Sequence, residues 1–251
     1  MPGWIVPPPR TPTKSAAEHA RARRRKVEWL EARGLLASPR IKAALLAVRR
    51  EDFVPREYRD YAYEEVPLPL PGAAATISCP HSYPLFYEPL GLDQGQRFLE
   101  IGTGSGYGAA VAREVVGPEG LVVSVEIDPA TQDFARHNLE RAGYRDVVLV
   151  LGDGWLGHPA AAPYDRVAVT AACDEMPPAL LAQLAPGGRA IAPLTDPQGR
   201  QMLTLITKLA DGAMRREALC KVLYVALRRR EGEAPTVRAA SREAPDSSGS
   251  R

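Results

Sequence analysis

Three side chains that can take part in catalysis lie within four positions of one another in the stretch AATISCPHSY: Ser78, Cys79 and His81. A hydroxyl or thiol beside an imidazole is the pairing that many hydrolases use for nucleophilic attack. However, no G-x-S-x-G motif surrounds Ser78, and the stretch precedes the part of the chain in which strands and helices alternate. We therefore do not expect a hydrolase. We expect His81 to line a cavity or to support the structure, and Cys79 to be a small packed residue.

A glycine-rich loop follows in the segment LEIGTGSGYG, residues 99–108. Gly102, Gly104 and Gly106 permit a sharp turn and the close approach of a ligand to the backbone. The helix expected behind them offers unpaired N–H groups. Alone the loop is a weak signal, because it also fits a dinucleotide fingerprint loosely. It indicates a nucleotide-like ligand without specifying which one.

Three acidic residues stand at the ends of the strands expected around this loop. Glu126 ends the second strand, where a carboxylate can accept hydrogen bonds from a ribose diol, and Asp153 is placed to accept from an exocyclic amine such as that of adenine. Glu100 would be unfavourable beside a pyrophosphate but suits the ammonium group of an amino-acid tail. This charge argument favours S-adenosylmethionine over NAD. Alternatively, the acids cap the following helices, which is an equally good explanation for Asp153 taken alone.

The elements that must position these residues alternate from residue 97 onward. Short apolar runs predict strands, and amphipathic runs that end in glycine predict helices. Together they predict an α/β fold with a doubly wound, mostly parallel, seven-stranded sheet. The expected helices are 105–117, 129–143 and 177–188, and the expected strands are 97–102, 120–128, 146–154, 164–172, 189–194, 201–210 and 218–227.

The first third of the chain has a different composition. Five prolines within residues 1–13 predict an extended arm. Helices are expected over 15–33 and from the Ser38-Pro39 cap onward, and the proline-rich segment 66–72 can be neither a helix nor a central strand. We therefore expect an arm (1–13), a helical segment with a connector (14–72), an α/β ligand-binding domain (73–230) and a disordered tail (231–251).

The composition argues against several classes of protein. No run of 18 apolar residues predicts a membrane span, and the N-terminus lacks the pattern of a signal peptide. Cys79, Cys173 and Cys220 form no C-x-x-C pair, so we expect no disulfide and no metal site, and a cytoplasmic location fits. The basic run RARRRK at 21–26 is better explained as a solvated helix face than as an RNA contact. We expect a monomer without membrane or nucleic-acid partners.

The order of the motifs is more specific than any one of them. FVP, ATIS, LEIGTGSGY, VEID, LGDG, YDRVAVTAA and LYVAL follow one another along the chain. Over residues 27–228 this order resembles the protein L-isoaspartate O-methyltransferase family, whereas the glycine motif alone would indicate only a class I methyltransferase. The resemblance implies the class I methyltransferase fold. It also implies transfer of a methyl group from S-adenosylmethionine to the free carboxylate of L-isoaspartyl residues in damaged proteins and peptides, which initiates their repair.

The resemblance also implies a set of site residues. Ser78 matches the family's active-site serine. Because the acceptor carboxylate is already an anion at pH 7, we expect Ser78 to orient it rather than to attack. The residues expected around the cofactor are Ala75, Thr76, Ile77, Ser78, Glu100, Gly102, Thr103, Gly104, Gly106, Glu126, Ile127, Asp153 and Gly154.

Several positions depart from the family pattern. Alanines stand where many members have a glutamine before the serine stretch, Tyr83 replaces a histidine, Arg228 falls near a family threonine, and Pro71 could reshape the acceptor channel. Two alternatives therefore stay open. One is a methyltransferase of the same fold that acts on another acceptor, such as a modified peptide carboxylate or an RNA base. The other is a non-catalytic nucleoside-binding module.

Overall fold

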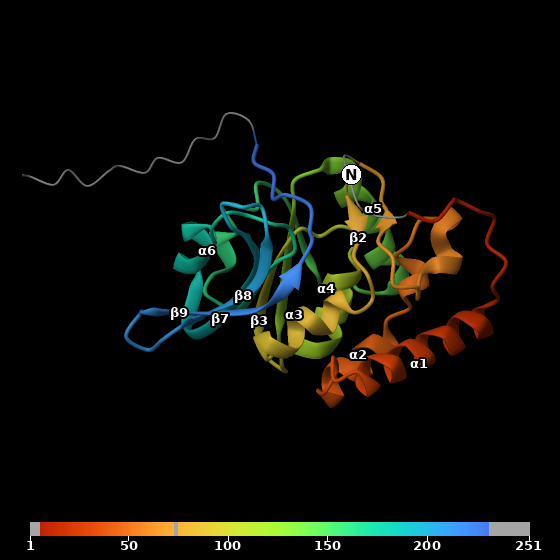
Figure 1. Ribbon diagram of the computed structural model, residues 1–251, viewed down its shortest axis with the longest axis horizontal. Helices are drawn as coiled ribbons and strands as arrows, with labels where there is room; N and C mark the ends of the chain where they lie inside the picture. Colours follow the sequence, from red (N-terminus) through yellow and green to blue (C-terminus); the bar gives the residue numbers. More distant parts are fainter. Residues whose placement is uncertain (1–5, 73–74, 231–251) are drawn as a thin grey trace, which may run out of the picture.

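A computed structural model describes residues 6–72 and 75–230 of the chain (Figure 1). Its centre is a seven-stranded sheet in the order β5-β4-β3-β6-β7-β8-β9. The first five of these strands are parallel, and β8 and β9 are antiparallel to their neighbours. This confirms the predicted mostly parallel sheet. The strands are β3 (Arg97–Ile101), β4 (Leu121–Glu126), β5 (Val148–Leu151), β6 (Tyr164–Val169), β7 (Leu184–Thr195), β8 (Gln201–Lys208) and β9 (Met214–Val222).

Both faces of the sheet are covered, so its central strands are apolar on both sides. Phe98 belongs to the core under the helices α3, α4 and α5, whereas its neighbour Leu99 belongs to the core under α6. Both side chains are fully buried. This arrangement explains why β3 and β4 have near-continuous apolar sequences. The helices are α3 (Ser82–Leu90), α4 (Tyr107–Val116), α5 (Pro129–Ala142) and α6 (Pro178–Ala182).

The connections create one point at which the strand order reverses. The chain places β4 and then β5 on one side of β3, and it returns to place β6 on the other side. Open α/β sheets bind ligands beyond the carboxyl ends of their strands at such a point. The residues that follow β3, β4 and β6 therefore meet at the edge where a ligand is expected.

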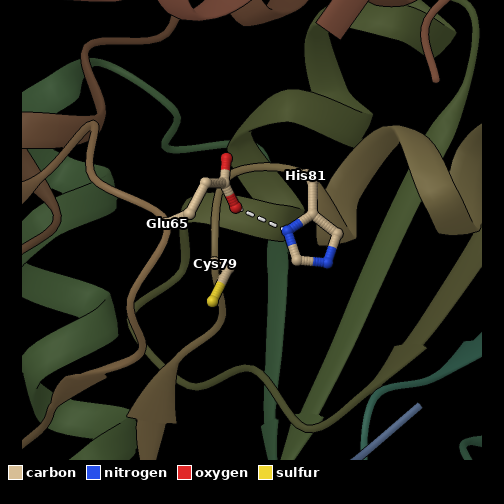
Figure 2. Close-up of side chains that lie close together, drawn as sticks. All are labelled: Glu65, Cys79 and His81. Atoms are coloured by element: carbon tan, nitrogen blue, oxygen red, sulfur yellow. Dashed lines mark hydrogen bonds and ion pairs between the residues drawn. The ribbon is translucent and has the colours of Figure 1, made fainter. Parts of the chain in front are cut away.

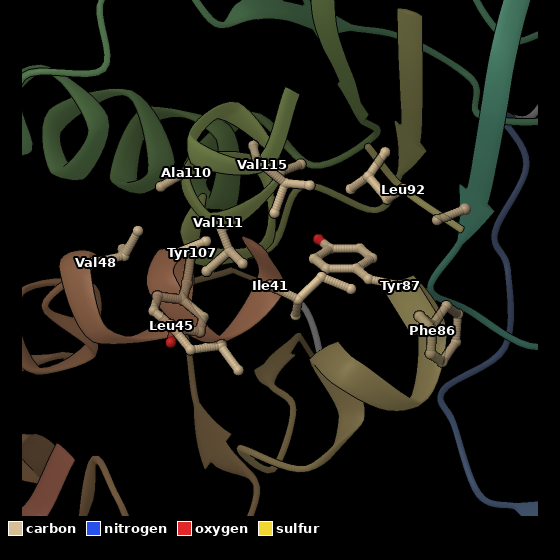
Figure 3. Packing of buried hydrophobic residues seen from close by; sticks show 14 of the residues in the cluster. Ile41, Leu45, Val48, Phe86, Tyr87, Leu92, Tyr107, Ala110, Val111 and Val115 are labelled. Atoms are coloured by element: carbon tan, nitrogen blue, oxygen red, sulfur yellow. The ribbon is translucent and has the colours of Figure 1, made fainter. Parts of the chain in front are cut away.

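An N-terminal segment packs against the outside of this domain. Its helices are α1 (Ala16–Ala32), which begins with a Ser15 capping box, and α2 (Pro39–Ala47), whose N-cap is Ser38. Ile41 and Leu45 of α2 face α4 in a shared apolar core (Figure 3). The predicted helix starts are thus confirmed. Two short 3-10 helices follow, η1 (Arg50–Asp52) and η2 (Arg56–Tyr61), and another, η3 (Pro159–Ala161), precedes β6.

The proline-rich connector forms the outer half of a small ribbon. Leu68–Pro69 (β1) pairs antiparallel with Thr76–Ile77 (β2), with Leu68 opposite Ile77. This agrees with the prediction that the connector is neither a helix nor a central strand. Two predicted features lie outside the described residues. They are the expected tail, 231–251, and the alanines at 73–74, which are among the positions that depart from the family pattern.

Two predictions about the elements were wrong, and one helix had not been predicted. The helix expected over 177–188 ends at Ala182, because Pro186 cannot continue a helix and Gly187 has a φ of +77°. The strand expected over 218–227 instead spans Met214–Val222, and the chain then leaves the sheet edge. The helix α3 was not expected, since two prolines interrupt its sequence, but Pro84 lies in the first turn and Pro89 in the last. Among the described helices, none has the length and apolar character needed to cross a bilayer.

A buried arginine joins the N-terminal segment to the rest of the fold. Arg50 is only 1% exposed. Its Nε donates to the Ala62 carbonyl and its Nη2 to the Ser78 carbonyl, both at 2.6 Å. The guanidinium also lies near the rings of Tyr83 and Tyr107, with 5.5 and 5.1 Å to their centroids. Removing this side chain would leave two backbone carbonyls without their donors.

We expect Arg50→Met to lower the free energy of unfolding by about 3 kcal/mol, because two buried acceptors lose a charged donor. The measurement is urea denaturation followed by circular dichroism. Arg136→Met is the matched control: Arg136 is 47% exposed and pairs with Asp133, itself 59% exposed, so its loss should cost less than about 1 kcal/mol. Equal losses for the two variants would contradict the structural role assigned to Arg50.

Candidate active site

A cavity of about 580 Å³ opens at the reversal point of the sheet. Its floor consists of the residues after β3, β4 and β6. Its walls are the serine-bearing stretch between β1 and α3 and the segment 221–228 at the end of β9. The volume lies within the range of about 300–1,000 Å³ that is usual for small-molecule sites. Of the residues expected at the site, ten line this cavity: Ala75, Thr76, Ser78, Glu100, Gly102, Thr103, Gly104, Glu126, Ile127 and Gly154.

Glu126 ends β4 and is held by backbone donors. Its Oε2 accepts from the Gly104 N–H at 3.0 Å, and its Oε1 accepts from the N–H groups of Ile127 and Asp128 at 3.0 and 3.1 Å. These bonds fix the carboxylate between the glycine loop and the start of α5. A carboxylate offers about four acceptor positions, so one remains for a ligand hydroxyl.

Glu100 lies deeper, and its environment is different. It is 2% exposed, and Ser124 Oγ donates to its Oε2 at 2.7 Å. The parallel register places Glu100 beside Ser124, so both side chains emerge on the same face of the sheet. Burial raises the pKa of Glu100 to about 8, which the Ser124 hydrogen bond opposes and the charge of Glu126 reinforces. Gly108 makes room for this side chain, because a Cβ there would approach Glu100 Oε1 to 2.2 Å.

The glycine loop brings the backbone close to the end of β6. Gly102 has a φ of +95°, and a Cβ at this position would lie 2.4 Å from Thr170 Oγ1. That hydroxyl donates to the carbonyls of Ile101 and Gly102, at 3.0 Å each. Thr103 adds a 2.7 Å hydrogen bond to Ser124 Oγ. The loop and the Glu100 pocket are therefore one hydrogen-bonded unit.

The serine-bearing stretch lines the opposite wall. Ser78 is half-buried, and its carbonyl is held by Arg50. The imidazole of His81 contacts Glu65 rather than serine: its Nδ1 lies 2.5 Å from Glu65 Oε2 (Figure 2). Cys79 is half-buried and lines the cavity, and burial raises the pKa of its thiol. The pairing of His81 with Glu65 gives no support to a serine hydrolase, in agreement with the sequence analysis.

Three of the expected residues do not line the cavity. Ile77 is buried behind the stretch at 2% exposure, and Gly106 forms the N-cap of α4. The Asp153 carboxylate accepts from the backbone N–H groups of Trp155 at 2.9 Å and Arg230 at 3.1 Å. These two bonds hold the adjoining loop, and neither donor begins a described helix, so Asp153 is not the helix cap considered above. Because a carboxylate offers about four acceptor positions, its contact with the cofactor stays a prediction.

The departures from the family pattern have definite positions. Tyr83 lines the cavity and packs edge-on against Tyr107, with 4.7 Å between the ring centroids. Arg228 also lines the cavity, and its Nη2 lies 3.8 Å from Asp128 Oδ2. The Pro71 carbonyl accepts from Thr131 Oγ1 at 2.8 Å, which places this residue against the start of α5 and away from the cavity lining.

Sequence reasoning missed the largest part of one wall. Eight consecutive residues, 221–228, line the cavity, and six of them follow the end of β9 at Val222. Ala172 fixes this segment, since its N–H donates to the Val225 carbonyl and its carbonyl accepts from the Leu227 N–H, both at 2.7 Å. The apolar run VLYVAL is typical of a strand, so the local sequence carries no signal that the chain leaves the sheet here.

Comparisons with known proteins agree with this arrangement. A family model described as protein-L-isoaspartate(D-aspartate) O-methyltransferase matches residues 21–232. The chain is 45% identical over 213 residues to a protein-L-isoaspartate O-methyltransferase of Methanopyrus kandleri, covering 84% of this chain and 93% of that protein. It is also 45% identical over 214 residues to the protein of the same name from Hyperthermus butylicus, covering 82% and 88%.

Solved structures give the same result for the fold, a class I methyltransferase sheet. One protein-L-isoaspartate O-methyltransferase superposes with a TM-score of 0.75 at 37% identity. The match covers 81% of this chain and 65% of the solved chain. A putative member from Plasmodium falciparum, solved in complex with S-adenosyl-L-homocysteine, superposes with a TM-score of 0.73 at 22% identity, covering 82% and 98%. By the family match and by its identity to these relatives, the chain belongs to the protein-L-isoaspartate(D-aspartate) O-methyltransferase family.

Proposed function

We propose that this protein transfers a methyl group from S-adenosylmethionine to the free carboxylate of L-isoaspartyl residues in damaged proteins and peptides, which initiates their repair. One observation carries the proposal: in a member of this family, Ser78 lines the same cavity as Glu100, Glu126 and the glycine loop. We call the part of the cavity lined by Ser78, Cys79 and His81 the acceptor end, and the part beside Glu100 and Glu126 the cofactor end.

The cofactor end fits S-adenosylmethionine. Glu126 has an acceptor position left for a ribose hydroxyl, and Glu100 offers a second carboxyl group for the amino-acid ammonium. Because Gly102 and Gly104 have no side chains, the backbone of the loop is accessible to a ligand in the cavity. When bound, the cofactor supplies a methyl group already activated by its positive sulfur. The protein therefore has to hold and orient it, and it need not activate it.

The acceptor end needs no general base. A free carboxylate has a pKa near 4 and is an anion at neutral pH, so no proton has to be removed before transfer. What remains is alignment of the two reactants, which contributes up to about 7–11 kcal/mol in favourable cases. We infer that the Ser78 hydroxyl orients the acceptor carboxylate, while Arg50 fixes the Ser78 backbone.

The basic run 21–26 is partly engaged in ion pairs within the protein. Two of the five basic residues in the run 21–26 are engaged, since Arg23 pairs with Glu51 at 3.0 Å and Lys26 with Glu65 at 2.9 Å. The run therefore presents only part of its charge to solvent. We further propose, from the sequence, a monomer that acts in the cytoplasm, where its three free cysteines would stay reduced.

The first prediction concerns the acceptor. With labelled S-adenosylmethionine and two peptides that differ only in isoaspartate or aspartate at one position, we expect base-labile label on the isoaspartyl peptide alone. Base lability identifies a methyl ester. Bound cofactor without label on either peptide would contradict the proposed acceptor, and total RNA would then be the next substrate to test.

The second prediction concerns Ser78. Ser78→Ala should lower kcat at least about tenfold, which corresponds to roughly 1.4 kcal/mol of lost orientation, with less than a twofold change in the Kd of the cofactor. Turnover is measured with the isoaspartyl peptide, and Kd is measured by calorimetry. Ser38→Ala is a control that removes the α2 cap, so it should cost about 1 kcal/mol of stability and leave turnover unchanged. An unchanged kcat in Ser78→Ala would exclude the orienting role.

The third prediction concerns Glu100. With its pKa raised to about 8, this carboxyl group is mostly neutral at pH 7. An incoming ammonium favours the ionised form, so binding should release up to about one proton from this group at pH 7, and affinity should rise as pH increases from 6 to 8. Calorimetry in two buffers of different ionisation enthalpy measures the release.

The matched control for this measurement is Glu100→Gln, which cannot ionise. The ligand's own amino group also has a pKa near 8, so it contributes to the measured proton exchange with both proteins. The difference between the wild type and this variant is therefore the contribution of Glu100. Equal release by both proteins would show that Glu100 does not ionise when the cofactor binds.

A further inference from the structure

Three residues with different metal-binding atoms converge at the acceptor end. The Glu65 carboxylate, the Cys79 thiol and the His81 imidazole each offer one atom, and these three atoms lie within 4.8 Å of one another (Figure 2). The small ribbon brings them together. Leu68 at the start of β1 pairs with Ile77 at the end of β2, so Glu65, shortly before β1, and Cys79 and His81, shortly after β2, leave the same end of the ribbon.

The combination of donors selects the class of ion. Magnesium and calcium are bound by oxygen atoms alone, whereas sulfur, nitrogen and oxygen together are typical of zinc. Three protein ligands leave one of the four positions around zinc open for water or another ligand. Of the chain's three cysteines, only Cys79 lines the cavity.

The cluster is accessible and can adjust to an ion. All three residues are half-buried, with 38% and 26% of the His81 and Glu65 side chains exposed. Lys26 binds the other carboxylate oxygen, Oε1, so Oε2 faces His81. Zinc would take the place of the hydrogen bond between His81 and Glu65, in which Nδ1 lies 2.5 Å from Oε2. Zinc forms bonds of about 2.0–2.2 Å at tetrahedral angles, so these two atoms would have to move to about 3.3 Å apart.

We propose that Glu65, Cys79 and His81 bind a zinc ion at the acceptor end of the cavity, and that the bound ion blocks methyl transfer. The sequence predicted no metal site, because the three ligands form no recognisable spacing: Glu65 precedes Cys79 by fourteen positions. The inhibitory effect is inferred from position, since Cys79 and His81 line the same cavity as Ser78. This second part rests on the proposed function, whereas the binding of zinc does not.

Cobalt(II) tests the ligands directly. We use the tag-free full-length chain, reduced with a phosphine because thiol reductants bind the metal themselves. The wild type and Cys220→Ser, the matched control for loss of a thiol, should each bind one cobalt(II) with a thiolate-to-cobalt absorption band. Cys79→Ser should lack the band. Absence of the band from the wild type, or its persistence in Cys79→Ser, would overturn the site.

Zinc affinity supplies a second measurement on the same proteins. In competition with a chromophoric chelator, Cys79→Ser and Glu65→Gln should each bind zinc at least tenfold more weakly than the wild type, and Cys220→Ser should match it. Circular dichroism confirms that each variant is folded. Equal affinity in the wild type and both ligand variants would show that zinc binds elsewhere.

Activity tests the second part of the proposal. Saturating zinc should lower turnover at least tenfold in the wild type and in Cys220→Ser. In Cys79→Ser, turnover with zinc should equal turnover without it. Unchanged turnover in the wild type when zinc is added, with the cobalt band present, would overturn inhibition while leaving the site. A zinc-free enzyme that fails to methylate the isoaspartyl peptide would contradict the proposed function, and the cobalt band would be unaffected.

Discussion

The position of the serine-bearing stretch depends on one buried guanidinium. The stretch has little regular structure of its own, since β2 contains two residues and pairs only with β1. Arg50 supplies the missing constraint by binding the Ser78 carbonyl and the Ala62 carbonyl at once. The Tyr107 ring beside it belongs to α4, which starts behind the glycine loop. The N-terminal segment is therefore part of the site, because it fixes the acceptor end relative to the cofactor end.

The two acids at the cofactor end show how the sheet assigns different properties to similar residues. Glu126 lies at the end of β4, where the chain turns and three backbone N–H groups are available to it. Glu100 lies one residue before the end of β3 and points into the core beneath α4, where Ser124 is its hydrogen-bonding partner. Desolvation dominates there and raises the pKa of Glu100. Two register positions on neighbouring strands thus separate a carboxylate held by three amides from one held by a single hydroxyl.

Most of the sheet could be predicted from the sequence, because its signals are local. The apolar runs of β3 and β4, the capped starts of α1 and α2 and the glycine loop each depend on neighbouring residues. The parts that could not be predicted depend on distant partners. Residues 223–227 have a strand-like sequence, but hydrogen bonds to Ala172 draw them away from the sheet edge. Asp153 likewise accepts from the backbone of Arg230, 77 positions further along the chain, and no local pattern indicates that contact.

The same pairing of β1 with β2 links the reaction to the metal-binding cluster. A shift of one residue in this register would turn the side chains of β2 to the opposite face. We expect it to displace Ser78, which follows β2, and to move Glu65 relative to Cys79 and His81. Arg50 opposes such a shift, because its bond to the Ser78 carbonyl exists in one register only. The constraint that positions Ser78 therefore also holds the three metal-binding atoms together, so any residue that stabilises this register supports both properties.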